Sequence, residues 1–324
     1  MPREGNDNGP PRERPVYYAG HMVLGLLFVG LASISWGTTG AVMTLLARET
    51  GATPLLVGWA RLAVAAPCLV VAAVASGHLA ARRGPAVALP WGALSALPTF
   101  ALLGLAMALY QVCYFTAVSL TGVAVAALLA ICSAPILIAL LAALFLGERV
   151  TPAVRASLAI AVVGTALLVV GPRGLGQISA RFGLGALLAL GAGLSYAVFA
   201  VAAKGVLARI DPLPVAAATF ALAALFLSPV VAREPSPWAH LGAGWRLVLY
   251  LGVGPTAIAY VLFTVGLRRV PATAAGVASL LEPLTASLLG VIAFGESLGA
   301  AGAAGALLLM IALATLALAH RARA

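Results

Sequence analysis

Charged residues are scarce in this chain. Only 9% of its 324 residues are charged, whereas a soluble globular domain carries about 25%. Cysteine is scarce as well: Cys68, Cys113 and Cys132 all lie inside apolar runs, without the spacing of metal ligands or of a disulfide framework. Because 63% of the residues are hydrophobic, a folded domain could not cover its surface with polar groups in water. The composition excludes an ordinary soluble protein and indicates one that resides in lipid.

The sequence motifs of common catalytic, phosphate-binding and metal sites are also missing. The sequence has no HExxH, no GxSxG and no glycine-rich phosphate loop. The four histidines fall at the ends of apolar runs or between them and share no ligand spacing. We therefore expect no enzyme, no cofactor, no metal and no drive by ATP. The net charge of +10 is spread over short segments, which is typical of membrane topology rather than of nucleic-acid binding.

What the sequence does contain is a series of long apolar stretches. Stretches of roughly 20 residues are long enough to cross a bilayer as helices, and they recur from residue 22 to residue 319. They lack the period-two alternation of a membrane barrel. The sequence predicts an all-α polytopic membrane protein with ten transmembrane helices. These lie near 22–47, 54–77, 93–118, 121–146, 153–171, 183–203, 213–232, 246–267, 271–294 and 299–319.

The basic residues give this protein an orientation. With the N-terminus inside, thirteen arginines and lysines fall on the cytoplasmic side and five outside, and only Arg61 lies within a span. This excess inside favours the count of ten and predicts that both termini are cytoplasmic, in a multi-pass protein of the plasma membrane. Residues 1–20 are polar with four prolines and are expected to form a disordered cytoplasmic tail.

One pattern occurs twice along the chain. Ala134-Pro135 and Glu282-Pro283 each open an apolar run that ends in Gly-Glu, at Glu148 and Glu296, and both pairs are offset by 148 residues. The repeat divides the chain into five-span halves at 21–172 and 182–320. Because five is odd, the second half must cross the membrane in the opposite sense to the first. Such an inverted repeat is typical of secondary transporters, whose substrate site lies between the halves.

These landmarks resemble those of the EamA branch of the drug/metabolite transporter superfamily. The matching features follow the order of the chain: Ser35-Trp36-Gly37, Pro54 to Arg61, Pro135 with Gly147-Glu148, Leu281-Glu282-Pro283 and Gly295-Glu296. The resemblance implies ten helices, with spans one to four and six to nine around a central cavity and spans five and ten at the periphery. It implies transport, often export, of small metabolites, amino acids or drugs. Basic residues deep in the late spans, expected for phosphorylated substrates, are lacking.

Two charged residues lie well inside spans and are the first candidates for a site. Glu282 is near the middle of the ninth span, where an ionisable group costs about 2.5–3.5 kcal/mol and marks an ion or proton path. Its alternative role is a hydrogen bond to a neighbouring helix beside Pro283. Arg61 lies about two turns into the second span, from which it either snorkels to the interface or faces inward to pair with Glu282 or with a substrate carboxylate.

Polar and aromatic residues inside spans form a second group of candidates. Their rings can stack on flat solutes or hold cations on their π faces, although each is also suited to packing. The set comprises Trp36, Tyr110, Gln111, Tyr114, Tyr196 and Tyr260. Aligning Ser35-Trp36 with Ser195-Tyr196 places aromatic residues at equivalent points of the two halves. Pro135 and Pro283 are expected to kink their helices.

These features together predict a secondary transporter of small organic solutes, an exporter working by proton-coupled alternating access. The alternatives are an uncoupled facilitator or channel and, less favoured, a membrane-embedded enzyme. The predicted partners of this transporter are its small-molecule substrate, membrane lipid and protons, and no nucleic acid is expected. Gly295 and Gly299 form a GxxxG motif that packs helices closely, and a homodimer through it is left open.

Overall fold

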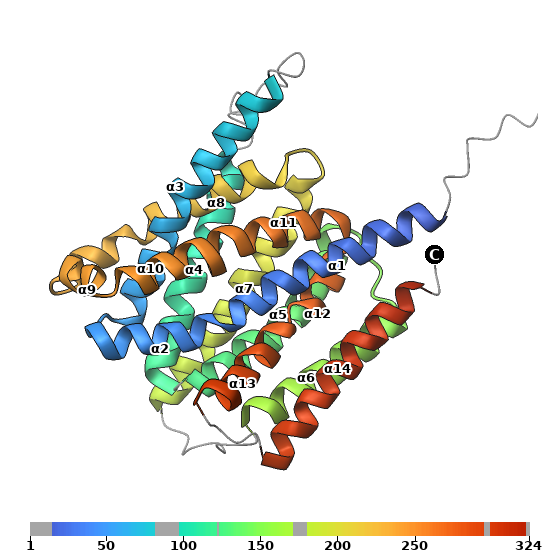
Figure 1. Ribbon diagram of the computed structural model, residues 1–324. Coiled ribbons are helices and arrows are strands. Elements are labelled where there is room, and N and C mark those ends of the chain that lie inside the picture. Colours follow the sequence, from blue (N-terminus) through green and yellow to red (C-terminus); the bar gives the residue numbers. More distant parts are fainter. Residues whose placement is uncertain (1–14, 82–96, 122, 171–179, 295–298, 322–324) are drawn as a thin grey trace, which may run out of the picture.

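The protein is a bundle of helices of unequal length (Figure 1). The computed structural model describes residues 15–81, 97–121, 123–170, 180–294 and 299–321. Within these ranges all regular structure is helical, as the sequence predicts.

Six helices make up the first half of the chain. They are α1 (Pro15–Gly37), α2 (Thr39–Thr50), α3 (Pro54–Ala81), α4 (Leu97–Thr121), α5 (Val123–Phe145) and α6 (Pro152–Val170). Proline opens α3 and α6, where its missing N–H costs no helical hydrogen bond. Gly51 ends α2 with φ 74° and donates its N–H to the Ala47 carbonyl, a left-handed cap that favours glycine.

The second half is more interrupted. Its elements are α7 (Ala180–Leu207), α8 (Pro212–Leu227), the 3₁₀-helix η3 (Ser228–Arg233), α9 (Pro237–Ala243), α10 (Trp245–Gly252), the π-helix η4 (Val253–Ile258), α11 (Ala259–Arg269), α12 (Ala272–Ala278), α13 (Leu281–Phe294) and α14 (Gly299–Arg321). The short helix α9 falls between the seventh and eighth predicted spans, where the sequence predicts no transmembrane helix.

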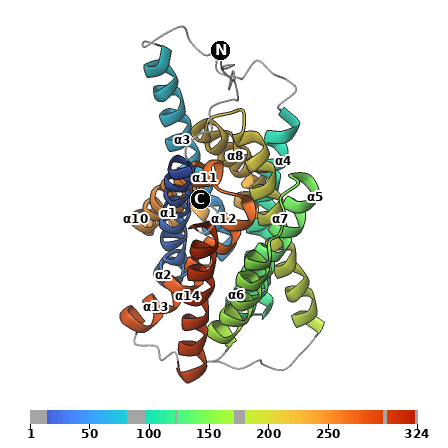
Figure 2. The same cartoon turned by 90° about the vertical axis from the view of Figure 1, so that its right-hand side faces the viewer.

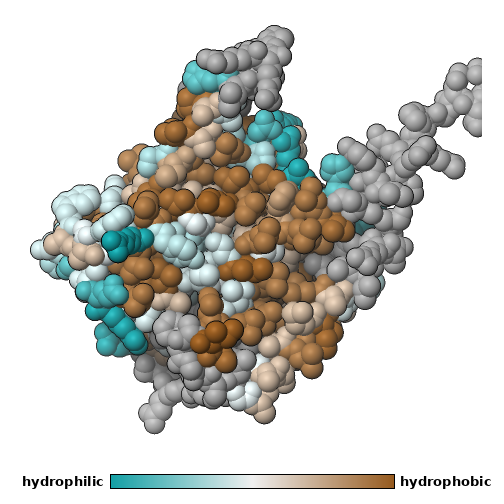
Figure 3. All heavy atoms as spheres, in the orientation of Figure 1, coloured by the Kyte–Doolittle hydropathy of each residue, from teal (hydrophilic) through white to brown (hydrophobic). Residues whose placement is uncertain are grey.

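Six helical stretches of the described chain are long and apolar enough to cross a membrane. They are His21–Thr50, Pro54–His78, Leu97–Thr121, Arg181–Leu207, Pro212–Arg233 and Trp245–Arg269. Large hydrophobic side chains remain exposed on the outside, among them Phe145 at 70% and Ile292 at 79%, and they cover most of the coloured face in Figure 3. An apolar exterior of this extent suits lipid. The chain is a multi-pass helical membrane protein.

Two predicted spans are broken near their middle. The first changes direction at Thr38, between α1 and α2, and the ninth is interrupted at Ser279 and Leu280, between α12 and α13. Pro283 lies in the first turn of α13, just after the second break, where a proline is tolerated. Pro135 lies inside α5, which continues through it. Neither break carries a proline of its own, so the proline pattern could not locate them.

The helices pair in a regular way. α4 packs on α7, α1 on α11, α3 on α8 and α5 on α12, whereas α6 and α14 lie side by side at one edge of the bundle (Figures 1 and 2). The largest apolar core lies among α1, α3, α4, α5, α7, α8, α11 and α12. The candidate residues of the first, third, sixth and eighth predicted spans contribute to it.

Candidate substrate site

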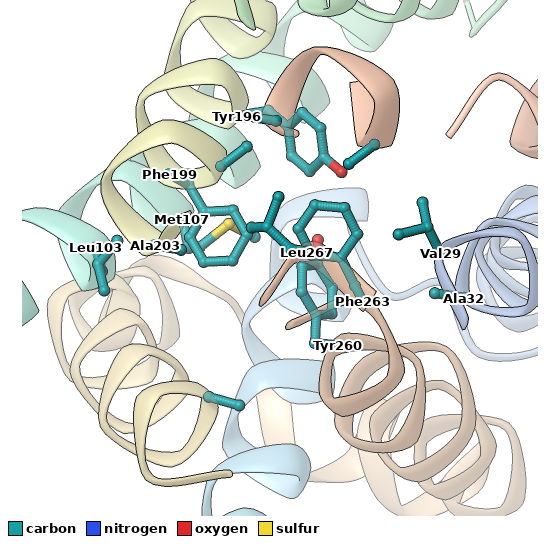
Figure 4. Packing of buried hydrophobic residues seen from close by; sticks show 14 of the residues in the cluster. Val29, Ala32, Leu103, Met107, Tyr196, Phe199, Ala203, Tyr260, Phe263 and Leu267 are labelled. Carbon is teal, nitrogen blue, oxygen red and sulfur yellow. The ribbon is translucent and has the colours of Figure 1, made fainter. Parts of the chain in front are cut away.

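An aromatic cluster forms the middle of this core. Trp36, the last residue but one of α1, has its ring centroid 4.7 Å from Tyr260, 5.3 Å from Phe263 and 6.1 Å from Tyr196, to which it is perpendicular. Figure 4 shows Tyr196, Tyr260, Phe263 and Phe199 converging from α7 and α11. Residues from the two halves of the sequence, 160 or more positions apart, therefore meet here.

The cluster continues towards α4. The Tyr196 ring lies 6.1 Å from that of Tyr110, which is stacked on Tyr114 at 5.7 Å. Phe220 of α8 adds a ring 4.5 Å from Tyr260. The five polar aromatic residues could be predicted from the sequence, but the phenylalanines could not, because a phenylalanine within an apolar span differs little from its neighbours.

Among the described residues, several buried polar atoms on the helices of this core have no hydrogen-bond partner. They are Trp36 Nε1, Gln111 Oε1, Tyr196 OH and Thr219 Oγ1. Leaving a buried polar group unpaired costs about 1–3 kcal/mol, so native proteins rarely keep such groups without a reason. Such groups, with Trp36 Nε1 in the cluster itself, are ones that a polar solute can satisfy.

Arg61 is buried beside this cluster. It is 7% exposed, and its side chain is buried between helices of the bundle. Its Nε donates a hydrogen bond to the hydroxyl of Thr256 at 2.9 Å. Within the described residues Arg61 forms no ion pair with Glu282, so that predicted pairing is not made. Thr256 could not be predicted from the sequence, since threonine is common in apolar helices.

Glu282 lies in the first turn of α13, directly after the break in the ninth predicted span. The residue is half-buried, and no hydrogen bond or ion pair holds its carboxylate in the described part of the chain. It is within electrostatic reach of Arg61 and of four tyrosines: Tyr110, Tyr114, Tyr196 and Tyr260. The structure thus brings both charged candidates to the aromatic cluster.

This arrangement can bind three kinds of group. The Arg61 guanidinium suits a carboxylate, the Glu282 carboxylate suits an ammonium group or a proton, and the rings suit flat or cationic groups. All eight candidate binding residues of the sequence analysis lie in or around one site.

Comparison with known proteins identifies the family. The model of the EamA-like transporter family matches the chain twice, at residues 23–170 and 183–318. The chain belongs to the EamA-like transporter family. A Bacillus subtilis relative named as an uncharacterized transporter, YwfM, is 36% identical over 91% of this chain and 94% of its own. The aromatic amino acid exporter YddG of Ancylobacter novellus is 33% identical over 63% of this chain and 68% of its own.

A solved crystal structure is similar as well. It has a TM-score of 0.74 and 27% sequence identity, and the alignment covers 93% of this chain and 98% of that one. The family and these relatives confirm the predicted resemblance and the predicted class. The protein is a membrane transporter of small solutes and not an enzyme.

Proposed function

We propose that this chain exports amino acids with aromatic or other flat side chains across the plasma membrane. It does so by alternating access between two inverted five-helix halves and in exchange for protons. The observation that carries the proposal is the meeting of Arg61 and Glu282 with the rings around Trp36, since together these groups complement the carboxylate, the ammonium and the ring of such a solute. The relative named as an aromatic amino acid exporter supports the same substrate class.

Close helix contacts support the repeat. A Cβ on Gly104 would meet Leu222 Cβ at 2.5 Å, and one on Gly252 would meet Val64 Cβ at 2.4 Å. The two glycines are equivalent in the repeat, because Gly252 follows Gly104 by 148 residues. Their contact residues are equivalent as well: Leu222 follows Val64 by 158 residues, which is the offset that aligns Pro54 with Pro212. The same contact is therefore made once by each half.

A second pair of contacts obeys the same rule. A Cβ on Gly25 would approach Arg269 Cβ at 2.8 Å, and one on Gly185 would approach Leu120 Cβ at 2.9 Å and Thr121 Cγ2 at 2.4 Å. Thr121 and Arg269 are again 148 residues apart. Two halves related by a twofold pseudo-symmetry axis explain both pairs, and with five spans in each half the axis lies in the membrane plane. The two separate family matches fit this division, with halves at 21–172 and 182–320.

The orientation of the chain in the membrane follows from the number of spans. An even number of spans returns the chain to its starting side, and the beginning of α1 and the end of α14 lie at the same end of the bundle (Figure 1). The excess of arginine and lysine in the segments on that side supports a cytoplasmic location of both termini. Residues 1–14 of the predicted tail lie outside the described residues, whereas Pro15 to Gly20 are helical and form the beginning of α1.

Alternating access needs contacts between the halves that can open. One such contact joins Glu148, after α5, to the start of α12: its carboxylate accepts hydrogen bonds from the N–H groups of Ala272 at 2.7 Å and Thr273 at 3.1 Å and from the Thr273 hydroxyl at 3.0 Å. Glu148 is the residue that ends the first copy of the repeated pattern. Its repeat partner Glu296 lies outside the described residues.

Proton exchange is assigned to Glu282. It is the carboxylate among the aromatic rings, it carries no bonded partner in the described chain, and its repeat partner is Ala134, so the role belongs to one half only. An inward proton gains about 2.3 kcal/mol per 100 mV of inside-negative potential, which suffices to drive export by exchange.

The test is counterflow in proteoliposomes. Purified protein is reconstituted, an inward or outward pH gradient is imposed, and uptake of labelled phenylalanine is followed. We expect the gradient to drive accumulation by the wild type, and Glu282→Gln to retain exchange of labelled for unlabelled phenylalanine while losing the response to the gradient. Glu49→Gln, on the exposed part of α2, is the matched control. An equal gradient response in Glu282→Gln would rule out coupling through this residue, and no response in either protein would favour the uncoupled facilitator.

A further inference from the structure

The eighth predicted span departs from regular helix at one place. Residues Val253–Ile258 form the π-helix η4 between α10 and α11. The corresponding stretch of the first half, 148 residues earlier at 105–110, lies within the continuous helix α4. π-turns are uncommon and frequently occur at functional sites, and this one breaks the symmetry of the two halves.

The hydrogen bonds of Thr256 explain what the π-turn does. Its hydroxyl donates to the carbonyl of Leu251, five residues earlier, at 2.7 Å and accepts from Arg61 Nε at 2.9 Å. In a regular α-helix a threonine hydroxyl reaches the carbonyl three or four residues earlier. The wider turn therefore fixes the hydroxyl with its lone pair directed at the guanidinium. Thr256 is fully buried, so water does not compete for either bond.

Holding Nε leaves the far end of the arginine free for another partner. Within the described residues, no hydrogen bond or ion pair involves the two Nη atoms of Arg61. A guanidinium with both terminal nitrogens unengaged can bind a carboxylate through two parallel hydrogen bonds, provided that its plane is fixed. Gly252 helps to fix it, because the bare backbone there lets α10 approach α3 at Val64, one turn from Arg61.

The hydrogen-bonded pair of Arg61 and Thr256 has no counterpart at the equivalent positions of the repeat. The partners of Arg61 and Thr256 in the other half are Thr219 and Ala108, which cannot form the same pair. The residue equivalent to Glu282 in the other repeat is likewise different, since it is Ala134. The charged groups and the π-turn thus form one asymmetric set within an otherwise duplicated bundle.

We propose that Thr256 is a positioning residue, which orients the Arg61 guanidinium from the π-turn so that both Nη atoms bind the carboxylate of the transported solute. This inference rests on the proposed function, because it requires a solute that bears a carboxylate. Thr256 itself does not touch the solute; it acts through Arg61.

The experiment compares two probes that differ only in the carboxylate, L-phenylalanine and phenethylamine. Counterflow is measured for the wild type, Thr256→Val and Thr256→Ser, with Thr264→Val as matched control, since the buried Thr264 hydroxyl bonds only to backbone carbonyls of its own helix. Thr256→Val is expected to raise the KM for phenylalanine about tenfold, as for loss of a hydrogen bond to a charged group, with little change in maximal rate. Thr256→Ser, which keeps the hydroxyl, is expected to restore the wild-type KM.

Two further comparisons distinguish a positioning role of Thr256 from general damage to the protein. In the Arg61→Ala background Thr256→Val is expected to have no additional effect, because the two residues act as one unit. Phenethylamine, as a transported probe or as a competitor of phenylalanine, should be affected less than twofold by Thr256→Val. An unchanged phenylalanine KM in Thr256→Val, or equal losses for both probes, would overturn the inference and leave the proposed function standing. Absence of phenylalanine counterflow in the wild type would overturn the proposed function and this inference with it.

Discussion

At the scale of residues, Trp36 is the centre of the site. Its ring contacts Tyr196, Tyr260 and Phe263, while its buried indole N–H has no hydrogen-bond partner in the part of the chain that the structure describes. The ring thus contributes packing, and the N–H remains available to a solute acceptor. Substitutions can separate these two contributions.

We expect Trp36→Phe to keep the ring contacts but to weaken solute binding by roughly fivefold, because one hydrogen bond contributes about 1 kcal/mol. Trp36→Ala should cost about 3–5 kcal/mol of stability through the space it leaves. Transport KM and thermal unfolding of the detergent-solubilised protein measure the two effects. Trp238→Phe, at a tryptophan 68% exposed on α9, serves as control. Equal KM values for Trp36→Phe and the wild type would remove the indole N–H from binding.

Residue patterns anticipated much of this site and missed a defined part of it. Glu282, Arg61 and the tyrosines could be predicted because polar groups are costly in an apolar span. Phe199, Phe220 and Phe263 could not, since they give no contrast with their neighbours. Thr256 could not be predicted either, because its role depends on a π-turn that only the folded backbone reveals, although the Gly-Pro pair at 254–255 lies within that turn.

At the scale of elements, the two broken helices meet. The end of α1 packs on the start of α13 so closely that a Cβ on Gly37 would lie 2.6 Å from Thr285 Cβ and 2.7 Å from the Glu282 carbonyl oxygen. Discontinuous helices near the middle of the membrane are a common way to build transporter sites. Glycine at this crossing lets the break of the first predicted span touch the turn that carries Glu282.

Gly37→Ala tests this crossing. We expect it to cost about 1–3 kcal/mol, as overpacking does, and to shift Glu282, so that both the melting temperature and the pH-gradient response fall. Gly40→Ala, whose added Cβ would meet nothing within 4 Å, should be neutral in both assays. If the two alanine variants behaved alike, a tight contact between α1 and α13 would be contradicted.

Helix boundaries were predicted best where the sequence contains signals for them. Pro54, Pro152 and Pro212 open helices close to the predicted positions. The breaks at Thr38 and at Ser279–Leu280 had no such signal, because the apolar pattern runs through both. They arise from packing between helices that are distant in the sequence, which a single span does not encode.

At the scale of the whole molecule, hydrogen bonds join segments that are far apart in the sequence. Glu148 joins the end of α5 to the start of α12 by three hydrogen bonds to its carboxylate. Each charge-assisted hydrogen bond of this kind contributes about 1.5–3 kcal/mol of stability. In the proposed transport cycle, this set of hydrogen bonds stabilises the arrangement in which the cytoplasmic ends of the two halves are together.

Glu148→Gln should therefore favour opening to the cytoplasm. In a background without native cysteines, we expect faster alkylation of Ser279→Cys, a buried position beside the site, by a reagent supplied from the cytoplasmic side. Arg149→Gln, at an exposed neighbour, should leave the rate unchanged. A Glu148→Gln rate no higher than that of Arg149→Gln would show that these hydrogen bonds do not close the cytoplasmic side.

The inversion of the two halves is tested most directly by the sidedness of equivalent positions. Residues 152 and 300 occupy the same place in the two repeats, 148 residues apart, and both are exposed at the start of a helix, α6 and α14. Pro152→Cys and Ala300→Cys are introduced singly into a cysteine-free background and labelled in intact cells with a membrane-impermeant maleimide. We predict immediate labelling at position 300 and labelling at position 152 only after permeabilisation. Labelling of both positions from the same side would contradict the inverted repeat.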